Sequence, residues 1–296
     1  MTKLLKTLSG LLLVLVLFVF ACQDKNKETI IKGKASLFVD ESIFPIVEDQ
    51  QAVFETEYDA KLKLITKSEN EIINSLMNDT VKIAVLPRKL SNDELKAFVA
   101  KKINPKMTHF ATDAVVFIRN KKSNDTLIAL DDVINFMKGN SVNGIKGLVF
   151  DNPNSSSVRL ISELSAIKIT PQKNIYSFNT NNEVIKYVAE NDGMIGVVGI
   201  NWLTQAPLDM QNNVDAVSVL SVKNINKQDY IYPSQDNLAQ GKYPLARDLY
   251  IINCQGYSGL GMGFASFLGG ERGQRIVLKS GLLPVRMPSR KIVIRK

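Results

Sequence analysis

Hydroxyl side chains stand at three places where a short apolar run gives way to an amphipathic stretch. Ser42 and Ser68 each begin one such stretch, and the triplet Ser155-Ser156-Ser157 begins another. The free backbone N–H groups and the positive dipole end of a helix N-terminus favour an anion, and a serine hydroxyl can donate one more hydrogen bond. We therefore predict that these three junctions supply a binding site for a small anion.

A serine at the start of a helix can also act only as an N-cap, which needs no ligand. For Ser68 the cap is the favoured interpretation, because Glu71 three residues later completes a capping box. Three consecutive serines exceed what capping requires. The loop Asn152-Pro153-Asn154 and the triplet that follows it are therefore the best local indication of a site.

Charged side chains lie near the same predicted junctions. Arg88 follows an apolar run, and Arg159 falls in the first turn after Ser155. Either guanidinium could hold an oxyanion through two parallel hydrogen bonds, and a solvated surface arginine is an equally good interpretation of each. Asp40 and Glu41 come directly after the first apolar run. Carboxylates repel a fully ionised anion, so this pair would act as proton acceptors for a ligand that still carries a proton.

The composition limits the classes of function. Hydrophobic residues make up 45% and charged residues 22% of 296 positions, the balance of an ordinary globular protein of one or two domains. The 37 basic and 29 acidic residues give a net charge of +8 that is spread along the chain. Such a charge is compatible with an anionic partner but selects none.

Several kinds of active site lack the residues that they need. His109 is the only histidine and there are two cysteines, so neither a Ser-His-Asp hydrolase nor a His-rich metal site can be assembled. Gly259, Gly261 and Gly263 do not have the spacing of a dinucleotide loop. Trp202 fits core or hinge packing better than a ligand platform. Basic residues lack the interleaved aromatic residues of a nucleic-acid surface. We therefore expect no enzyme, no cofactor, no metal and no nucleic acid.

The spacing of apolar residues predicts an α/β fold in two parts, with the end of the chain returning to the first part. The expected strands are residues 35–39, 62–65, 83–86, 114–118, 148–150, 194–198, 216–222 and 249–253. The expected helices are residues 42–54, 68–77, 91–99, 131–137, 155–164, 182–189, 258–267 and 271–279. The polar segments 203–215 and 223–244 are expected to be connections. In parallel α/β sheets, ligands lie beyond the carboxyl ends of strands, where helices begin.

The first 21 residues have the layout of an export signal. Two lysines precede an apolar run at residues 11–20, which is shorter than the ~20 residues that a spanning helix needs. The segment Val19-Phe20-Ala21-Cys22 resembles a bacterial lipobox, in which Cys22 is lipidated and becomes the mature N-terminus. The alternative is a simple signal peptide with an incidental cysteine. Residues 22–33 would then form a tether between lipid and fold.

Six segments match a known family in order across nearly all of the mature chain. They are Ser42-Ile43-Phe44-Pro45-Ile46-Val47, residues 83–90, Thr112-Asp113-Ala114-Val115-Val116, Asn154-Ser155-Ser156-Ser157, Gly193-Met194-Ile195-Gly196-Val197-Val198-Gly199 and Tyr243-Pro244-Leu245-Ala246-Arg247-Asp248-Leu249-Tyr250. With these segments the chain resembles the phosphate-binding proteins of bacterial ABC importers, in the type II periplasmic-binding-protein superfamily. Lipoprotein members from the Bacteroidetes are the most similar.

This resemblance implies a two-lobed fold, with mainly parallel sheets flanked by helices and a hinge between the lobes. Residues 34–114 and 247–296 would form lobe 1, and residues 115–246 would form lobe 2. The lobes would close on phosphate or a related oxyanion and deliver it to an ABC importer permease. The protein would be a monomer, anchored through lipid in the cell envelope and exposed to the periplasm.

The resemblance also implies which residues contact the anion. They are Ser42, Ser68, Ser155 and Ser157, with Ser156 in place of a glycine, while Thr112 and Asp113 lie on the strand that crosses between the lobes. Departures from the family accompany these matches. Asp151 replaces an arginine, and the second junction is acidic, Ser68-Glu69-Asn70-Glu71. These departures motivate an alternative function, a non-transport envelope lipoprotein of the same fold that acts as a sensor or protein-interaction module.

Overall fold

The structure of this protein is a computed structural model that describes residues 28–167 and 173–289. The predicted export signal at residues 1–21 and the predicted lipidation site Cys22 lie outside the described residues. Across the described ranges, no helix combines the length and the apolar character that crossing a lipid bilayer requires.

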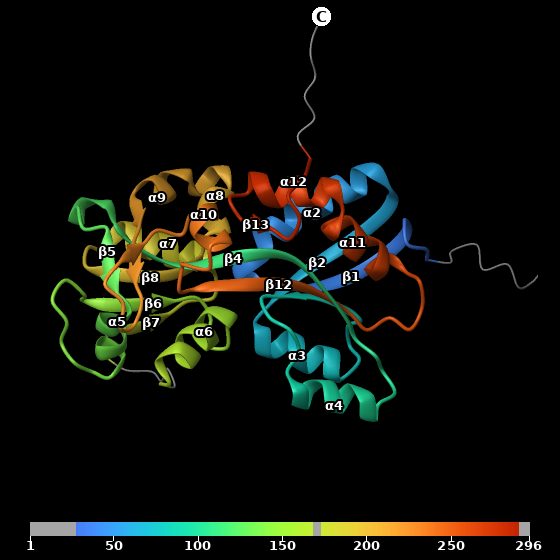
Figure 1. Ribbon diagram of the computed structural model, residues 1–296, viewed down its shortest axis with the longest axis horizontal. Helices are drawn as coiled ribbons and strands as arrows, with labels where there is room; N and C mark the ends of the chain where they lie inside the picture. The colour runs from blue at the N-terminus through green and yellow to red at the C-terminus, as the bar shows by residue number, and fades with distance from the viewer. Residues whose placement is uncertain (1–27, 168–172, 290–296) are drawn as a thin grey trace, which may run out of the picture.

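One mixed sheet runs through the molecule and joins its two halves (Figure 1). Its strands lie in the order β2 (Asp59–Lys67), β1 (Lys32–Asp40), β3 (Ile83–Leu86), β12 (Ala246–Asn253), β4 (Lys106–Asn120), β8 (Met194–Gly199), β6 (Gly147–Phe150) and β7 (Ile175–Ser177). Two further strands, β9 (Val217–Val219) and β13 (Leu283–Pro284), also pair with β4. A separate small sheet has the order β11 (Tyr230–Ile231), β10 (Ser221–Lys223) and β5 (Leu127–Ala129).

The long strand β4 belongs to both halves. It pairs with β12 as far as Ala114, and from Val115 onward it pairs with β8 and then β9. We call the half built on β1, β2 and β3 lobe 1, and the half built on β6, β7 and β8 lobe 2. Within each lobe these strands are parallel, whereas β4 and β12 run antiparallel to their neighbours. The sheet is therefore parallel inside the lobes and antiparallel where it crosses between them.

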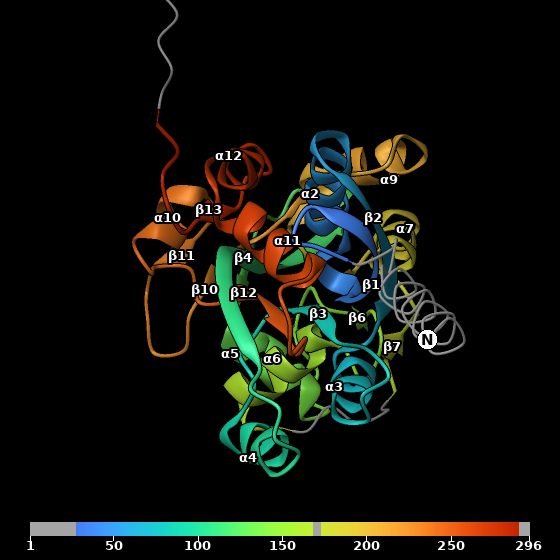
Figure 2. The same ribbon diagram turned by 90° about the vertical axis from the view of Figure 1, so that its right-hand side faces the viewer.

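Helices cover both faces of the sheet, as parallel strands joined by crossovers require. Lobe 1 carries α2 (Phe44–Glu57), α3 (Glu69–Met77) and α4 (Asn92–Ala100), with α11 (Leu260–Gly269) and α12 (Glu271–Lys279) from the end of the chain. Lobe 2 carries α5 (Leu130–Met137), α6 (Ser156–Ser165) and α7 (Asn181–Glu190), and the shorter helices are α8 (Asn201–Thr204), α9 (Gln211–Asp215) and α10 (Gln235–Ala239). Single 3₁₀ turns are η1 (Glu41–Ile43), η2 (Lys121–Ser123) and η3 (Leu208–Met210). Figure 2 shows α2 and α12 on one side of the sheet and α3 and α4 on the other.

Each strand and helix expected from the sequence has a counterpart, but two expectations need correction. The single strand expected at 216–222 is two strands, because β9 pairs with β4 while β10 pairs with β5 in the small sheet. The polar segments expected as connections contain short elements, among them α9 and α10. The helix α10 forms because Ser234 Oγ caps it by accepting a hydrogen bond from Asn237 N (3.2 Å).

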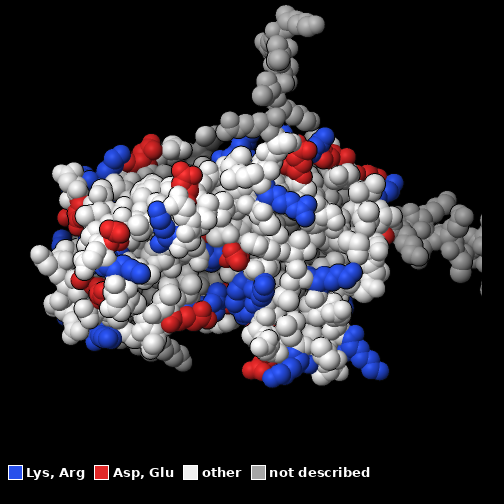
Figure 3. All heavy atoms as spheres, viewed as in Figure 1, with Lys and Arg blue, Asp and Glu red and all other residues white. Residues whose placement is uncertain are grey.

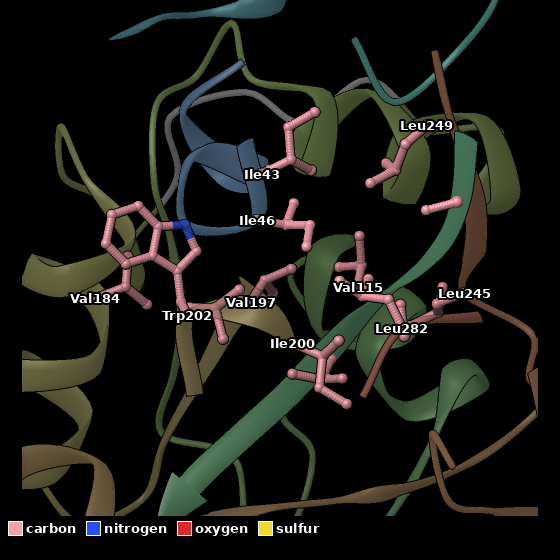
Figure 4. Packing of buried hydrophobic residues seen from close by; sticks show 14 of the residues in the cluster. Ile43, Ile46, Val115, Val184, Val197, Ile200, Trp202, Leu245, Leu249 and Leu282 are labelled. Carbon is pink, nitrogen blue, oxygen red and sulfur yellow. The ribbon is translucent and has the colours of Figure 1, made fainter. Parts of the chain in front are cut away.

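The hydrophobic core continues from one lobe into the other. Figure 4 shows Ile43 and Ile46 of the η1–α2 segment near Val115 of the crossing strand and Val197 of β8, and all four are fully buried. Trp202 is 7% exposed in the same cluster, and its Nε1 donates to the backbone oxygen of Glu41 (3.1 Å). The segment that follows β1 is therefore held between the two lobes.

Charged side chains of both signs are mixed on the molecular face seen in Figure 3. Lys and Arg lie among Asp and Glu there, in keeping with a net charge of +8 that is spread along the chain. This face therefore presents no extended basic stripe of the kind that binds nucleic acid.

Candidate functional site

Side chains from both lobes meet where β1 ends. Asp40 is the last residue of β1 and is 1% exposed. Its Oδ1 accepts hydrogen bonds from Ser42 N (3.1 Å), from Ser42 Oγ (2.5 Å) and from Ser156 Oγ at the start of α6 (3.0 Å). The two serine hydroxyl oxygens are 3.0 Å apart. Asp40 Oδ2 is buried and accepts no hydrogen bond. One carboxylate therefore gathers donors from lobe 1 and lobe 2.

A buried ion pair on the crossing strands adjoins this carboxylate. Arg247 on β12 is 6% exposed, and Asp113 on β4 is fully buried. Arg247 donates from Nε (3.0 Å) and Nη2 (2.8 Å) to Asp113 Oδ2, and from Nη1 to Ser156 Oγ (2.9 Å). Because these contacts use several donors of one planar group, they fix its orientation. Arg247 thereby brings a positive charge to the hydroxyl of Ser156.

The three consecutive serines have three different environments. Ser155 caps α6, since its Oγ accepts from Val158 N (3.3 Å) and donates to Asp151 Oδ1 (2.6 Å). Ser156 makes the contacts across the lobes described above. Ser157 is fully buried, and its Oγ has no hydrogen-bond partner. Buried hydroxyls nearly always have a partner, so the Ser157 hydroxyl is available to a water molecule or a ligand.

A second pair of carboxylates shares one amide across the lobes. Glu41 Oε1 accepts from Asn181 N (3.0 Å), and Asn181 Nδ2 donates both to Glu41 Oε2 and to Asp151 Oδ2, the latter at 3.3 Å. Burial, and then the charge of Asp151, raise the pKa of Glu41 to about 8. Burial and the charge of Asp40 raise the pKa of Asp151 to about 7, although the hydrogen bond from Ser155 opposes this shift. Both shifts favour the protonated forms of these carboxyl groups.

Arg88 and Arg159 meet at a single buried carboxylate. Glu69 is the first residue of α3 and is 1% exposed, and its Oε1 accepts from Arg88 Nε (2.8 Å) and Arg159 Nε (2.7 Å). The terminal nitrogens of Arg88 bind Glu94, and Nη1 of Arg159 binds Glu163. The two arginines expected to hold an oxyanion are thus brought together between the lobes, where they hold a carboxylate of the chain itself.

The η1 turn of lobe 1 lies against the end of β8 in lobe 2. Asn201 Nδ2 donates to Ser42 O (3.1 Å), and a Cβ atom added at Gly199 would lie 2.3 Å from the same oxygen. Gly199 is therefore required here by the close approach of two backbones. Together with the contacts of Asp40 and Glu41, this packing describes lobes that are closed on each other.

Two candidate residues, Ser68 and Thr112, form their hydrogen bonds outside the group of side chains around Asp40. Ser68 Oγ (2.7 Å) and Ser68 N (3.0 Å) both donate to Glu71 Oε2, as the capping box predicted. Thr112 Oγ1 donates to Asp248 Oδ1 (2.7 Å). Consecutive residues of a strand point to opposite faces of the sheet, so Thr112 lies on the face away from Asp113. Neither hydroxyl is grouped with those of Ser42 and Ser156.

A comparison with protein families matches residues 31–272 to a model described as the PBP superfamily domain. The chain belongs to the PBP superfamily. This result confirms the superfamily that the sequence segments indicated. No curated protein matches the chain.

Solved structures with the PBP-superfamily fold align with this chain over nearly their whole length. A protein from Clostridium perfringens, described as a phosphate ABC transporter substrate-binding protein with bound phosphate, has a TM-score of 0.71 at 19% identity and covers 86% of this chain and 100% of its own. An ABC-type phosphate transport receptor from Vibrio cholerae gives 0.62 at 15% identity, with coverages of 85% and 100%. The CcmR regulatory domain from Synechocystis, in complex with 2-PG, gives 0.54 at 12% identity, with coverages of 80% and 96%. These likenesses confirm the two-lobed type II fold.

Two buried polar atoms of this PBP-superfamily member, Ser157 Oγ and Asp40 Oδ2, lack hydrogen-bond partners. The hydroxyl of Ser157 and the guanidinium of Arg247 are donors, whereas Asp40 Oδ2 is a free acceptor. Within the described ranges, no group of three or more His, Cys, Asp or Glu side chains is placed to hold a metal ion.

Sequence reasoning did not identify Arg247, Asn181 or Glu69 as members of the site. Arg247 opens an apolar strand, and a charged residue there needs a buried partner, which an Asp on another apolar strand supplies. These two features of the sequence could have indicated that Arg247 and an aspartate form a buried ion pair. Asn181 meets a carboxylate 140 positions away in the sequence, and no local pattern indicates such a contact.

Proposed function

We propose that this protein captures phosphate, or a related oxyanion that still carries a proton, between its two lobes for delivery to the permease of an ABC importer. The observation that carries the proposal is the set of contacts across the lobes made by Asp40, Ser156 and Arg247, together with the buried, unpartnered hydroxyl of Ser157, the next residue along α6. Hydroxyl and guanidinium groups donate to the oxygens of an oxyanion, and Asp40 accepts a hydrogen bond from its remaining O–H group. The bound phosphate of the Clostridium perfringens protein and the transport role of the Vibrio cholerae receptor support this choice of ligand.

The proposal includes the remaining features expected from the sequence. Residues 34–114 and 247–296 form the first lobe and residues 115–246 the second, a division supported by the change of β4 partner after Ala114. Removal of residues 1–21 leaves a lipid on Cys22, which tethers a monomer in the cell envelope on the periplasmic side. The tether expected at residues 22–33 ends before Lys32, because Lys32 and Gly33 pair with Asp59 and Ala60 in the sheet. The protein binds and does not catalyse.

Phosphate is expected to raise the melting temperature of the protein in a saturable way, and replacement of Ser157 by Ala is expected to weaken this effect. The Ser157 hydroxyl is free to donate to a charged ligand, and loss of such a bond costs ~1–3 kcal/mol of binding free energy. Thermal shift across a phosphate series measures both quantities.

The matched control is Ser155→Ala, two residues earlier on the same helix. Ser155 Oγ is already used by Val158 N and Asp151, so its loss lowers stability by ~1 kcal/mol and leaves phosphate affinity nearly unchanged. Equal phosphate affinity in wild type and Ser157→Ala would show that the serine triplet only starts the helix. The absence of any shift at millimolar phosphate would refute the proposed ligand.

A second function, a sensor or protein-interaction module of the same fold, is favoured by one specific observation. The carboxylate of Glu69 holds both Arg88 and Arg159, and the CcmR regulatory domain has the same fold. A thermal-shift screen of small anions separates the two functions. Stabilisation by an oxyanion supports the proposed ligand, and capture of an importer permease by the same protein supports transport. No response to any anion, together with a defined protein partner in the envelope, supports the second function.

A further inference from the structure

The carboxylate of Glu69 pairs with one arginine from each lobe and so joins the lobes. Glu69 and Arg88 belong to lobe 1, whereas Arg159 lies on α6 of lobe 2, and both guanidinium groups donate from Nε to the same oxygen, Oε1, at 2.8 Å and 2.7 Å. The other oxygen, Oε2, is buried and has no hydrogen-bond partner. Guanidinium groups bind carboxylate and phosphate oxygens in the same manner, so Glu69 occupies a place that suits an oxyanion.

Neither helix capping nor neutralisation within a lobe explains this arrangement. The N-terminus of α3 is capped by Ser68 with Glu71, so it does not depend on Glu69. Within lobe 1, Arg88 already pairs with Glu94 through two bonds of 2.8 Å. Within lobe 2, Arg159 already pairs with Glu163 (2.8 Å). Among the ion pairs of Arg88 and Arg159, the one between Glu69 and Arg159 is the one that joins the two lobes.

We propose that Glu69 is a tethered anion that closes the lobes in the absence of ligand and competes with an incoming oxyanion for Arg88 and Arg159. This inference rests on the proposed function for the competition, but the closing contact is independent of the ligand. A group on a short tether acts at a local concentration in the millimolar range, so a free anion must displace a strong competitor. Glu69 thereby sets the ligand affinity of the site.

The test compares Glu69→Gln with the matched control Glu163→Gln in the purified protein. Both variants remove one carboxylate that contacts Arg159, but Glu163 is exposed and binds it within lobe 2. Small-angle X-ray scattering without ligand measures lobe closure, and isothermal titration with inorganic phosphate measures affinity. We expect Glu69→Gln to be more extended than wild type, to become compact with phosphate, and to bind phosphate at least ~10-fold more tightly. Glu163→Gln should match wild type in both measurements.

Three other outcomes of these measurements separate the inference from the proposed function. If Glu69→Gln is as compact as wild type and binds phosphate no more tightly, the inference is wrong. If phosphate binds wild type but binds Glu69→Gln more weakly, Glu69 supports the ligand and the inference is also wrong, while the proposed function stands. If Glu69→Gln opens but no form binds phosphate, the closing contact stands and the proposed ligand fails.

A second variant tests the same contact in case Glu69→Gln does not fold. Arg159→Gln removes the same contact from the side of lobe 2, where the side chain is 26% exposed. We expect Arg159→Gln to be extended without ligand, and a radius of gyration equal to that of wild type would overturn the inference.

Discussion

Replacement of Arg247 by Met is expected to lower the free energy of unfolding by about 3–5 kcal/mol. The substitution leaves Asp113 without its partner. Asp113 is fully buried and accepts two hydrogen bonds from the guanidinium. Without Arg247, the carboxylate must either stay charged in an apolar environment or take up a proton, and both are costly. Urea denaturation of the two proteins at neutral pH measures the difference.

Two further variants make this prediction specific to the buried pair. Arg275→Met removes an arginine whose partner Glu271 lies one helical turn away in an exposed position, and we expect a loss below about 1 kcal/mol. The double variant Arg247→Met with Asp113→Leu is expected to recover part of the loss, because an apolar pair can replace a buried ion pair. A cost for Arg247→Met no greater than that for Arg275→Met would contradict the structural role given to this pair.

Between pH 5 and pH 8, the free energy of unfolding is expected to fall by about 3 kcal/mol. Burial raises the pKa of Glu41 from 4.5 to about 8 and that of Asp151 from 3.8 to about 7. In this range the unfolded chain has lost these protons while the folded protein retains them, so stability decreases as the pH rises. One pKa unit corresponds to ~1.4 kcal/mol, and the two groups share neighbours, so their effects do not add in full.

Urea denaturation at pH 5, 6.5 and 8 measures this trend. Burial also raises the pKa of Asp40, Asp113 and Asp49, which acts in the same direction. Glu71 and Glu94 have lowered pKa values, so their contribution changes below their ordinary value of 4.5, and the chain has one histidine. Glu41→Gln removes one of the two titrating groups and should make the profile less steep, whereas Glu163→Gln on the surface of α6 should leave its slope unchanged. Stability that is constant or rises from pH 5 to pH 8 would contradict the protonated state of this cluster.

Most elements of the fold could be predicted because their signals are local. The capping boxes at Ser68 and Ser91 and the apolar runs of β3 and β6 are read from neighbouring residues. The full length of β4 could not be predicted, because its first part has mostly half-buried side chains and no continuous apolar run. Its place in both lobes depends on pairing with β12 and β8, which are distant in the sequence.

Residues of the candidate site could be predicted only where their place in the sequence, directly after a strand, indicated them. Asp40, Ser42 and Ser156 follow strand ends, where ligands of α/β sheets lie, so each could be named from the sequence. Their meeting could not be predicted, because β1 and β6 belong to different lobes and are brought together by the antiparallel strands β12 and β4. The role of Glu69 was not predictable, because it depends on Arg159, 90 positions away. An acidic residue at a helix start is also stabilised by the helix dipole, which gives it an ordinary local explanation.

Isothermal titration calorimetry with phosphate, and with sulfate and molybdate for comparison, tests most directly whether an oxyanion binds between the lobes. The proposed function predicts saturable binding of phosphate to one site, tighter than that of sulfate, because Asp40 can accept a hydrogen bond from protonated phosphate and sulfate carries no proton at neutral pH. No binding heat at millimolar phosphate, or equal affinity for sulfate, would contradict this account of the site.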